Sequence, residues 1–407
     1  MASTCQSVEG ETVGLSLHSY WLITFLRRGP MKSLKEIESS FWRQAGFKYR
    51  LLDKILILKR LAEIPYVLMQ SSRRFKSETG KSSLWQFFSL VGAVLFLKLR
   101  AKEYYLYRLD QVSDRIFQQT FIPQACFLRW AWYLNLRSCQ KIWWDKLSFF
   151  SFCLENKLTT VPILSVYEKG EKRELVPMDA SCDVIVKPDN GSCGLGVERW
   201  KFHESCYQWD EKRLDSVDFE SYLLNLGRQE CILLQPCLVN HPEMKGLNNG
   251  GLATVRCSTF KNAEGGAEAI MPVLRMPCGV SIVDNFQRDN LVAPIDLDSG
   301  KLGPAYRKID GVVVEVLRHP DTGCVIEGER LPFWRELIAL CLDAQKCCKE
   351  EQFVGWDVAI TLEGPVLIEA NLSFGIEAIQ VAHSLGLGST PFINRLDSLL
   401  QEPQGKG

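Results

Sequence analysis

Two carboxylates and one amide are grouped within a short apolar segment near the end of the chain. The segment Gly355–Asn371 reads GWDVAITLEGPVLIEAN, which predicts two β-strands joined by a turn at Leu362–Pro365. Asp357 lies in the first strand, and Glu369 and Asn371 lie two residues apart in the second, so these two should point to one side of the sheet. Three oxygen donors without His or Cys suit Mg²⁺, which keeps several waters and binds substrate phosphates. The segment predicts a nucleotide site, and the alternative is an edge hairpin with solvated acids.

A glycine-rich loop follows an apolar strand about a domain's length earlier in the sequence. The segment Val184–Val197 reads VIVKPDNGSCGLGV. The strand ends near Lys187, whose ammonium can neutralise phosphate oxygens. Glycines at this spacing let backbone N–H groups approach a phosphate closely. No Gly-Lys-Ser/Thr sequence closes the loop and no dinucleotide-binding fingerprint is present, so it is neither a P-loop nor a Rossmann loop.

Together these two segments resemble the ATP-grasp superfamily, and residues 140 to 385 are similar to its sugar-transfer-associated family. Further segments carry the likeness. WDKLSFF at Trp144–Phe150 resembles the helix that leads into the fold, and ILLQPCLVNHPEM at Ile232–Met244 resembles the hinge between the lobes. The Thr-x-Arg strand at Ala253–Arg256 and the loops Val283–Asn285 and His319–Gly323 also match the family. The resemblance implies an α+β ATP-grasp fold, in which two α+β lobes clamp ATP.

The resemblance also implies which residues bind the nucleotide. ATP phosphates would be held by Lys187, Asn190, Gly191, Ser192, Gly194 and Gly196, and adenine would be contacted from the hinge by Gln235, Pro236, Cys237 and Leu238. Glu243 is the candidate for the ribose hydroxyls. The family hinge often begins with Glu, whereas this chain has Gln235, so adenine would meet a neutral amide.

Metal and catalytic roles are implied in the same way. Asp357, Glu369 and Asn371 would hold Mg²⁺. The catalytic candidates are Lys187, Arg256 and Arg275, the two arginines neutralising the transferring phosphate or a substrate carboxylate. The cofactors expected from this set are ATP and Mg²⁺.

The hydrophobic pattern changes near residue 140. Apolar residues recur at three- and four-residue steps through 41–68 and 104–132, which predicts a mostly helical N-terminal region over residues 1–140, with an irregular start. Beyond this point short β-branched runs such as Val161–Val166 alternate with helical patterns such as Leu331–Lys349, and residues 141–400 are expected to form the ATP-grasp domain. The helical, aromatic N-terminal region departs from the α/β domain that precedes the fold in many relatives.

One run in the N-terminal region is strongly apolar. Leu84–Leu97 offers about 14 residues, fewer than the roughly 20 that a helix needs to cross a bilayer, and Gln86 and Ser89 interrupt it. We expect this run to form a buried helix, and the protein to be soluble without detergent. The alternative is a peripheral contact of the run with a membrane surface. A second apolar run, Tyr20–Leu26, is shorter.

The charge balance and the cysteines indicate which partners and which cellular compartment to expect. Lys and Arg number 48, as do Asp and Glu, so no global field recruits nucleic acid. The basic, aromatic stretches 27–60 and 73–108 are expected to be helical surfaces beside a core. The 15 cysteines show no zinc-ribbon spacing and no secretory signal is visible, which favours reduced thiols and a cytoplasmic protein.

The chemistry expected of such a site is attack on the γ-phosphate of ATP. The first hypothesis is an ATP-dependent ligase that activates a small-molecule carboxylate as an acyl phosphate and joins it to an amine, in polysaccharide, sugar-conjugate or secondary-metabolite biosynthesis. The alternatives are a small-molecule kinase that uses the same site, and a nucleotide-binding scaffold. The oligomeric state is not indicated by the sequence.

Overall fold

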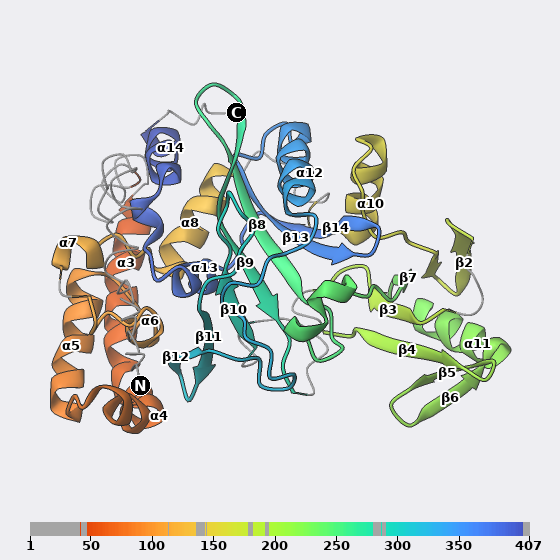
Figure 1. Cartoon of the computed structure of the whole chain (residues 1–407). Coiled ribbons are helices and arrows are strands. Elements are labelled where there is room, and N and C mark those ends of the chain that lie inside the picture. Colours follow the sequence, from red (N-terminus) through yellow and green to blue (C-terminus); the bar gives the residue numbers. More distant parts are fainter. Residues whose placement is uncertain are drawn as a thin grey trace, which may run out of the picture.

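The computed structural model describes residues 41, 47–112, 114–135, 143, 145–177, 182–191, 195–279, 286 and 290–401. Within them the chain forms two antiparallel sheets, flanked at one end by a group of helices (Figure 1). Several predicted features lie outside the described residues: the start of the chain, Trp144, the loop positions Ser192, Cys193 and Gly194, and the Val283–Asn285 loop.

The described N-terminal region is helical, as predicted. Its helices are α3 (Phe47–Ala62), α4 (Ile64–Thr79), α5 (Ser83–Phe96), α6 (Ala101–Leu106), α7 (Arg115–Gln118) and α8 (Gln124–Leu134). Local signals set their ends: Pro65 lies in the first turn of α4, Gly80 ends that helix at φ 71°, and the Ser82 side chain accepts from the Trp85 N–H at the start of α5.

The small lobe is built on the first sheet. Its strands are β1 (Ser165–Glu168), β2 (Glu171–Glu174), β3 (Val184–Pro188), β4 (Glu198–His203), β5 (Cys206–Trp209), β6 (Lys212–Asp215) and β7 (Ile232–Pro236), in the order β2-β1-β7-β3-β4-β5-β6. Helix α11 (Ser216–Gly227) packs on this sheet, and Trp200, Phe219 and Leu223 lie in their shared core.

The large lobe is built on the second sheet. Its strands are β8 (Thr254–Lys261), β9 (Ala267–Met276), β10 (Leu291–Pro294), β11 (Ala305–Ile309), β12 (Val312–Val316), β13 (Phe353–Thr361) and β14 (Gly364–Asn371), in the order β12-β11-β10-β9-β8-β13-β14. The remaining helical elements are α10 (Lys146–Glu155), α12 (Trp334–Cys347), α13 (Glu377–Ala382), α14 (Pro391–Gln401) and the 3₁₀ turns η1 (Pro242–Leu247) and η3 (Leu387–Ser389).

Helices cover both faces of the large sheet. Helices α10 and α12 share one core cluster with alternate residues of β13 such as Trp356, and α8, α13 and α14 share another with residues such as Phe353. Every residue of β13 is therefore buried. This explains why its sequence is a continuous apolar run rather than an alternation.

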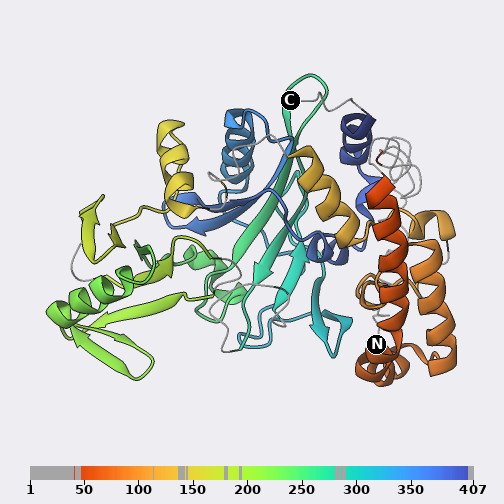
Figure 2. The same cartoon turned by 180° about the vertical axis from the view of Figure 1, so that it is seen from behind.

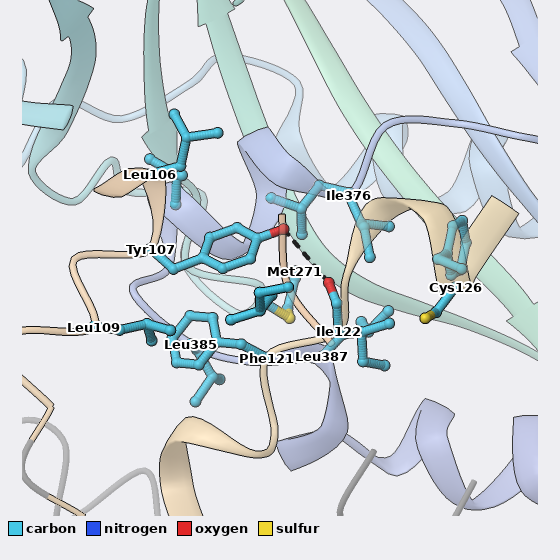
Figure 3. Packing of buried hydrophobic residues seen from close by; sticks show 14 of the residues in the cluster. Leu106, Tyr107, Leu109, Phe121, Ile122, Cys126, Met271, Ile376, Leu385 and Leu387 are labelled. Atoms are coloured by element: carbon cyan, nitrogen blue, oxygen red, sulfur yellow. Dashed lines mark hydrogen bonds between the residues drawn. The ribbon is translucent and has the colours of Figure 1, made fainter. Parts of the chain in front are cut away.

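The N-terminal helices and the C-terminal half of the chain share one hydrophobic core. Figure 3 shows Tyr107 donating its hydroxyl to the Ile122 carbonyl at 3.4 Å, among residues that include Met271, Ile376 and Leu385. The N-terminal helices thus pack directly against the large lobe, and the small lobe lies on the opposite flank in both views (Figures 1 and 2).

Helix α5 confirms one prediction and corrects another. The predicted helix over Leu84–Leu97 is present, but the expectation that it would be buried is wrong for one of its faces, where Leu84, Phe88 and Phe96 are exposed. The few polar residues of the segment do not mark its outward face, since Gln86 is buried. None of the helices in the described ranges combines the length and apolar character needed to cross a membrane.

Candidate functional site between the two lobes

The hairpin of β13 and β14 places the predicted metal ligands side by side. The strands pair antiparallel, and Asp357 lies directly opposite Glu369. The register shifts just after Asp357, and this bulge takes up the extra residue of β14. The Asn371 amide donates to the Glu369 carboxylate at 3.2 Å, so these two side chains do share one side of the sheet.

Two arginines from neighbouring strands hold the Asp357 carboxylate. Arg256 on β8 donates through Nε to Oδ1 at 2.5 Å and through Nη2 to Oδ2 at 3.0 Å. Arg275 on β9 contacts Oδ2 at 3.1 Å and donates to the Thr254 hydroxyl at 2.6 Å. All three charged side chains are largely buried, and the guanidinium groups hold the pKa of Asp357 far below its usual range despite its burial.

The Glu369 carboxylate has the opposite environment. Burial and the neighbouring charge of Asp357 raise its pKa. A carboxylate that lies against another carboxylate is stabilised when it takes up a proton or a cation. Because Arg256 and Arg275 already compensate Asp357, Glu369 and Asn371 are the oxygen donors best placed to receive a further cation, and this oxygen-only set fits Mg²⁺.

Lys187 reaches the same place from the small lobe. It lies near the end of β3, where pairing with β4 stops and the glycine loop begins. Burial and the neighbouring ammonium of Lys146 lower the pKa of Lys187 to about 8, and Glu369 and Asp189 oppose this shift. The two lobes thus bring a lysine and a glutamate together that are far apart in the sequence.

The described part of the glycine loop turns sharply at Gly196. This residue has φ +71°, and a Cβ there would lie 2.9 Å from the Pro188 ring, so only glycine is accommodated without strain. Asn190 and Gly191 are exposed and precede the turn. These two loop residues are therefore accessible to solvent.

Lys146 is a further candidate site residue, which the sequence analysis did not select. Its ammonium donates to the backbone carbonyls of Asp189 at 2.9 Å and Gly191 at 3.0 Å. Burial lowers the pKa of Lys146, while Glu369, Asp189 and Asp145 oppose the shift. The available signal was the Asp-Lys pair that opens the expected helix: Asp145 caps α10 by accepting from the Ser148 N–H at 2.8 Å, which fixes Lys146 in the first turn.

The predicted hinge residues connect the two sheets. Gln235 is buried in β7 and its amide donates to the Val161 carbonyl at 3.4 Å, while the Val161 N–H bonds to Leu367 of β14. Beyond β7, the Cys237 N–H bonds to the Asp183 carbonyl. Pro236, Cys237 and Leu238 are half-buried, and Glu243 is exposed on η1.

A second group of possible metal ligands is engaged in hydrogen bonds with backbone groups. Cys278, His319 and Asp321 have ligand atoms within 4.8 Å of one another. The His319 Nδ1 accepts from the Asp321 N–H at 3.3 Å, and its Nε2 lies 3.1 Å from the Pro277 carbonyl. Both ring nitrogens are thus engaged, and the Asp321 carboxylate accepts from the Gly279 N–H. This cluster holds two loops together.

Solved structures with a similar backbone arrangement include ATP-grasp ligases of low sequence identity. D-alanine–D-alanine ligase from Bacillus anthracis has 14% identity and a TM-score of 0.37, covering 65% of this chain and 70% of its own. The ATP-grasp ligase PsnB, solved with a minimal precursor, has 14% identity and a TM-score of 0.36, covering 68% of each chain. D-alanyl-alanine synthetase A from Vibrio cholerae has 12% identity and a TM-score of 0.37, covering 64% of each chain.

Among proteins of curated function, none matches the sequence of this chain. The family comparison is specific: residues 129–395 match the family described as sugar-transfer associated ATP-grasp. That match spans more than half of the chain and contains both strands of the Asp357–Glu369 hairpin, Lys187 and the hinge. The chain therefore belongs to the sugar-transfer associated ATP-grasp family.

Proposed function

We propose that this protein is an ATP- and Mg²⁺-dependent ligase that joins a small-molecule carboxylate to an amine. The observation that carries the proposal is the cluster of charges where the lobes meet: the lysines Lys187 and Lys146 lie near Glu369, which lies opposite Asp357 on the β13–β14 hairpin. A nucleotide triphosphate with its cation would relieve both pairs, because phosphate oxygens attract the lysines and the cation attracts the carboxylates.

Each predicted residue then has a role in phosphoryl transfer. Lys187, Lys146 and the loop around Asn190, Gly191, Ser192, Gly194 and Gly196 would hold the phosphates, and the hinge from Gln235 to Leu238, with Glu243, would hold the nucleoside. Glu369, Asn371 and Asp357 would hold Mg²⁺, which neutralises phosphate charge when bound. Arg256 and Arg275 lie beside these carboxylates, where they can orient the substrate carboxylate or stabilise the transferring phosphoryl group.

The proposed reaction has two balanced steps. A carboxylate oxygen of the substrate attacks the γ-phosphorus, and the bond to the β–γ bridging oxygen breaks, so that ADP leaves and an acyl phosphate remains. An amine then attacks the acyl carbon and phosphate leaves, with one proton released. The family description favours a substrate from polysaccharide or sugar-conjugate synthesis, for which uronic acids and amino sugars are the matching carboxylates and amines.

An isotope experiment tests the ligase assignment. The enzyme would be incubated with Mg·ATP and a pool of ¹⁸O-carboxylate uronic acids, with and without amino sugars. We expect ADP and ¹⁸O-labelled inorganic phosphate only when both partners are present, because the acyl phosphate carries one carboxylate oxygen to phosphate. A phosphorylated product without free phosphate would instead identify a kinase.

Nucleotide binding can be tested separately from turnover. Calorimetry with Mg²⁺ and a non-hydrolysable ATP analogue should show that Lys187→Ala weakens binding by roughly 10- to 100-fold, as expected for loss of a charge-assisted contact. Lys201, an exposed lysine on β4 of the same lobe, provides the matched control as Lys201→Ala. Equal affinities of the wild type and Lys187→Ala would overturn the assignment of this site.

A further inference from the structure

Helix α5 has an inverted distribution of polar and apolar side chains. Its Gln86 is fully buried, donates to the carbonyls of Ser72 and Lys81, and accepts from the Tyr105 hydroxyl. In contrast, Leu84, Phe88 and Phe96 on the other side are 68%, 64% and 82% exposed. A predominantly apolar helix is normally buried, so one half of α5 lacks its cover in the described structure.

The two preceding helices extend this apolar exposure. Leu58 on α3 is 68% exposed and Met69 on α4 is 82% exposed, and both helices contact α5. The three helices form the outer flank of the molecule, away from the small lobe, in both views (Figures 1 and 2). We call the exposed residues of this flank the outer helical face; its large apolar members are Ile55, Leu58, Tyr66, Met69, Leu84, Trp85, Phe87, Phe88, Leu95 and Phe96.

The same three helices carry an excess of positive charge. Residues 47–100 contain 11 Lys and Arg but only 3 Asp and Glu, whereas the whole chain is neutral. Two of the acids are already paired, Glu63 with Arg100 and Glu78 with Arg74. The exposed Lys59, Arg73 and Lys76 form no ion pair within the described residues.

Basic and apolar groups alternate closely on this flank. Arg73 and Lys76 follow Met69 at four and seven residues along α4, so they lie on the same side of the helix. The Lys81 ammonium lies 4.9 Å from the centre of the Trp85 ring at the start of α5. Trp beside a cation is the side-chain combination found at the boundary between lipid headgroups and acyl chains.

We propose that the outer helical face docks on an anionic lipid surface, with α5 lying in the plane of the interface. The apolar residues would enter the acyl boundary, and the cations would meet headgroup phosphates. With 14 residues α5 is too short to span a bilayer, which leaves the in-plane arrangement. The small lobe lies on the opposite flank, so docking leaves the nucleotide site accessible.

Charge distinguishes this occupant from two others. A second copy of the chain docking through the same face in a symmetric dimer would bring two basic surfaces together, which is unfavourable. Residues 1–40 contain four basic and four acidic residues and so bring no net negative charge to this face. An anionic bilayer supplies both an apolar layer and negative charge.

Vesicle flotation of the full chain tests the proposal. Vesicles of equal parts phosphatidylcholine and phosphatidylglycerol should bind at least about tenfold more protein than phosphatidylcholine alone, and high salt should reduce this excess. The double variant Phe88→Glu/Phe96→Glu should reduce binding to the anionic vesicles by about tenfold or more, since it places two charges in the apolar layer. Val217→Glu/Leu317→Glu changes two comparably exposed apolar residues elsewhere and should bind as the wild type does.

A second variant tests the basic residues separately from the apolar ones. Arg73→Gln/Lys76→Gln removes two exposed cations without touching the core and should weaken binding to anionic vesicles by on the order of tenfold, with no effect on phosphatidylcholine. Failure of the wild type to bind either vesicle would overturn the proposal. A dimer that Phe88→Glu/Phe96→Glu dissociates would then assign the face to a second copy. Equal binding to both vesicles would overturn the anionic selectivity.

Discussion

Buried polar groups are arranged differently at two places in this molecule. Where the N-terminal helices meet the large lobe, Gln380 accepts from the N–H groups of Ile122 and Leu387 and donates to the Ile122 carbonyl, all at 2.9–3.0 Å. Where the lobes meet, the half-buried Lys187 and Lys146 lie near the half-buried Glu369, and Glu369 lies opposite Asp357 on the neighbouring strand. In the first arrangement the amide of Gln380 has hydrogen-bond partners for both of its polar atoms, whereas in the second like charges lie close together, and the proposed nucleotide and cation would complete it.

The comparison separates a structural role from a functional one. A closed set of hydrogen bonds stabilises the fold, and removing a member leaves buried groups unpaired. A set of like charges destabilises the fold, and removing a member relieves that repulsion but weakens the binding of a ligand. Substitutions at the junction should therefore change stability alone, and substitutions between the lobes should change binding or turnover alone.

The largest effect is expected for Glu369→Gln. Loss of this carboxylate should reduce ADP formation by about 1,000-fold or more, since it removes the donor best placed to hold the cation against the phosphates. The unfolding free energy should not fall, because the substitution also removes a buried charge that Asp357 repels. A coupled ADP assay and urea unfolding measure the two quantities.

The same hairpin supplies the control for this change. Glu363 is exposed in the turn between β13 and β14, and Glu363→Gln should leave turnover unchanged. If Glu369→Gln formed ADP at the wild-type rate with saturating Mg·ATP, the hairpin would have no catalytic role.

Gln380→Ala tests the junction and should have the opposite signature. The substitution removes three hydrogen bonds at a fully buried position, although the Ile122 carbonyl keeps the bond from Tyr107, and at about 1 kcal/mol each we expect destabilisation of roughly 3 kcal/mol. Affinity for the ATP analogue should be unchanged. Gln380→Glu retains the accepting oxygen but sets a second oxygen against the Ile122 carbonyl, so it should also be destabilising. If Gln380→Ala lost nucleotide affinity but kept its stability, the junction would not have a purely structural role.

The sequence predicted features that depend on short stretches of chain. The Asp357–Glu369 hairpin could be predicted because both strands and the turn lie within Gly355–Asn371, and Lys187 because its strand and loop are contiguous. The contact between Arg256 and Asp357 joins residues 101 positions apart, and it depends on the pairing of β8 with β13. No local pattern specifies which strands pair.

The features that could not be predicted depend on the third dimension. Lys146 was not selected because its importance comes from lying beside the carbonyls of Asp189 and Gly191. The exposed side of α5 was missed because hydrophobicity predicts that a residue avoids water but does not identify what covers it. Family membership supplied the fold where periodicity alone indicated only helices and strands.

A pH series on Glu103 extends the comparison to a buried charge at the junction. Its carboxylate accepts from the N–H groups of Arg100 and Gln124, and burial raises its pKa from 4.5 to about 7. The folded state then keeps a proton that the unfolded state releases, so stability should fall as the pH rises from about 4.5 to about 7 and level off above. We expect this group to contribute roughly 3 kcal/mol to the change.

Urea unfolding of the wild type and Glu103→Gln across this range measures the effect. The variant cannot titrate at this position, so the unfolding free energy of the wild type minus that of the variant should fall as the pH rises to about 7 and then stay constant. A constant difference across the whole range would show that Glu103 titrates normally and would weaken the contrast between the two regions. Nucleotide affinity should follow the same pH dependence in both proteins.

The smallest effect is expected for Lys146→Met, which tests whether the lysine missed in the sequence belongs to the site. Its ammonium holds the carbonyls of Asp189 and Gly191 while its burial lowers its own pKa, so the loss of these bonds and the relief from desolvation should largely cancel in stability. Affinity for the ATP analogue should fall by about tenfold, because one charge-assisted contact is lost. Lys201→Met, at an exposed position of the same lobe, should have no effect on affinity. If Lys146→Met destabilised the protein and kept its affinity for the ATP analogue, Lys146 would have a structural role like that of Gln380. The proximity of Lys146 to Lys187 would then have no part in nucleotide binding.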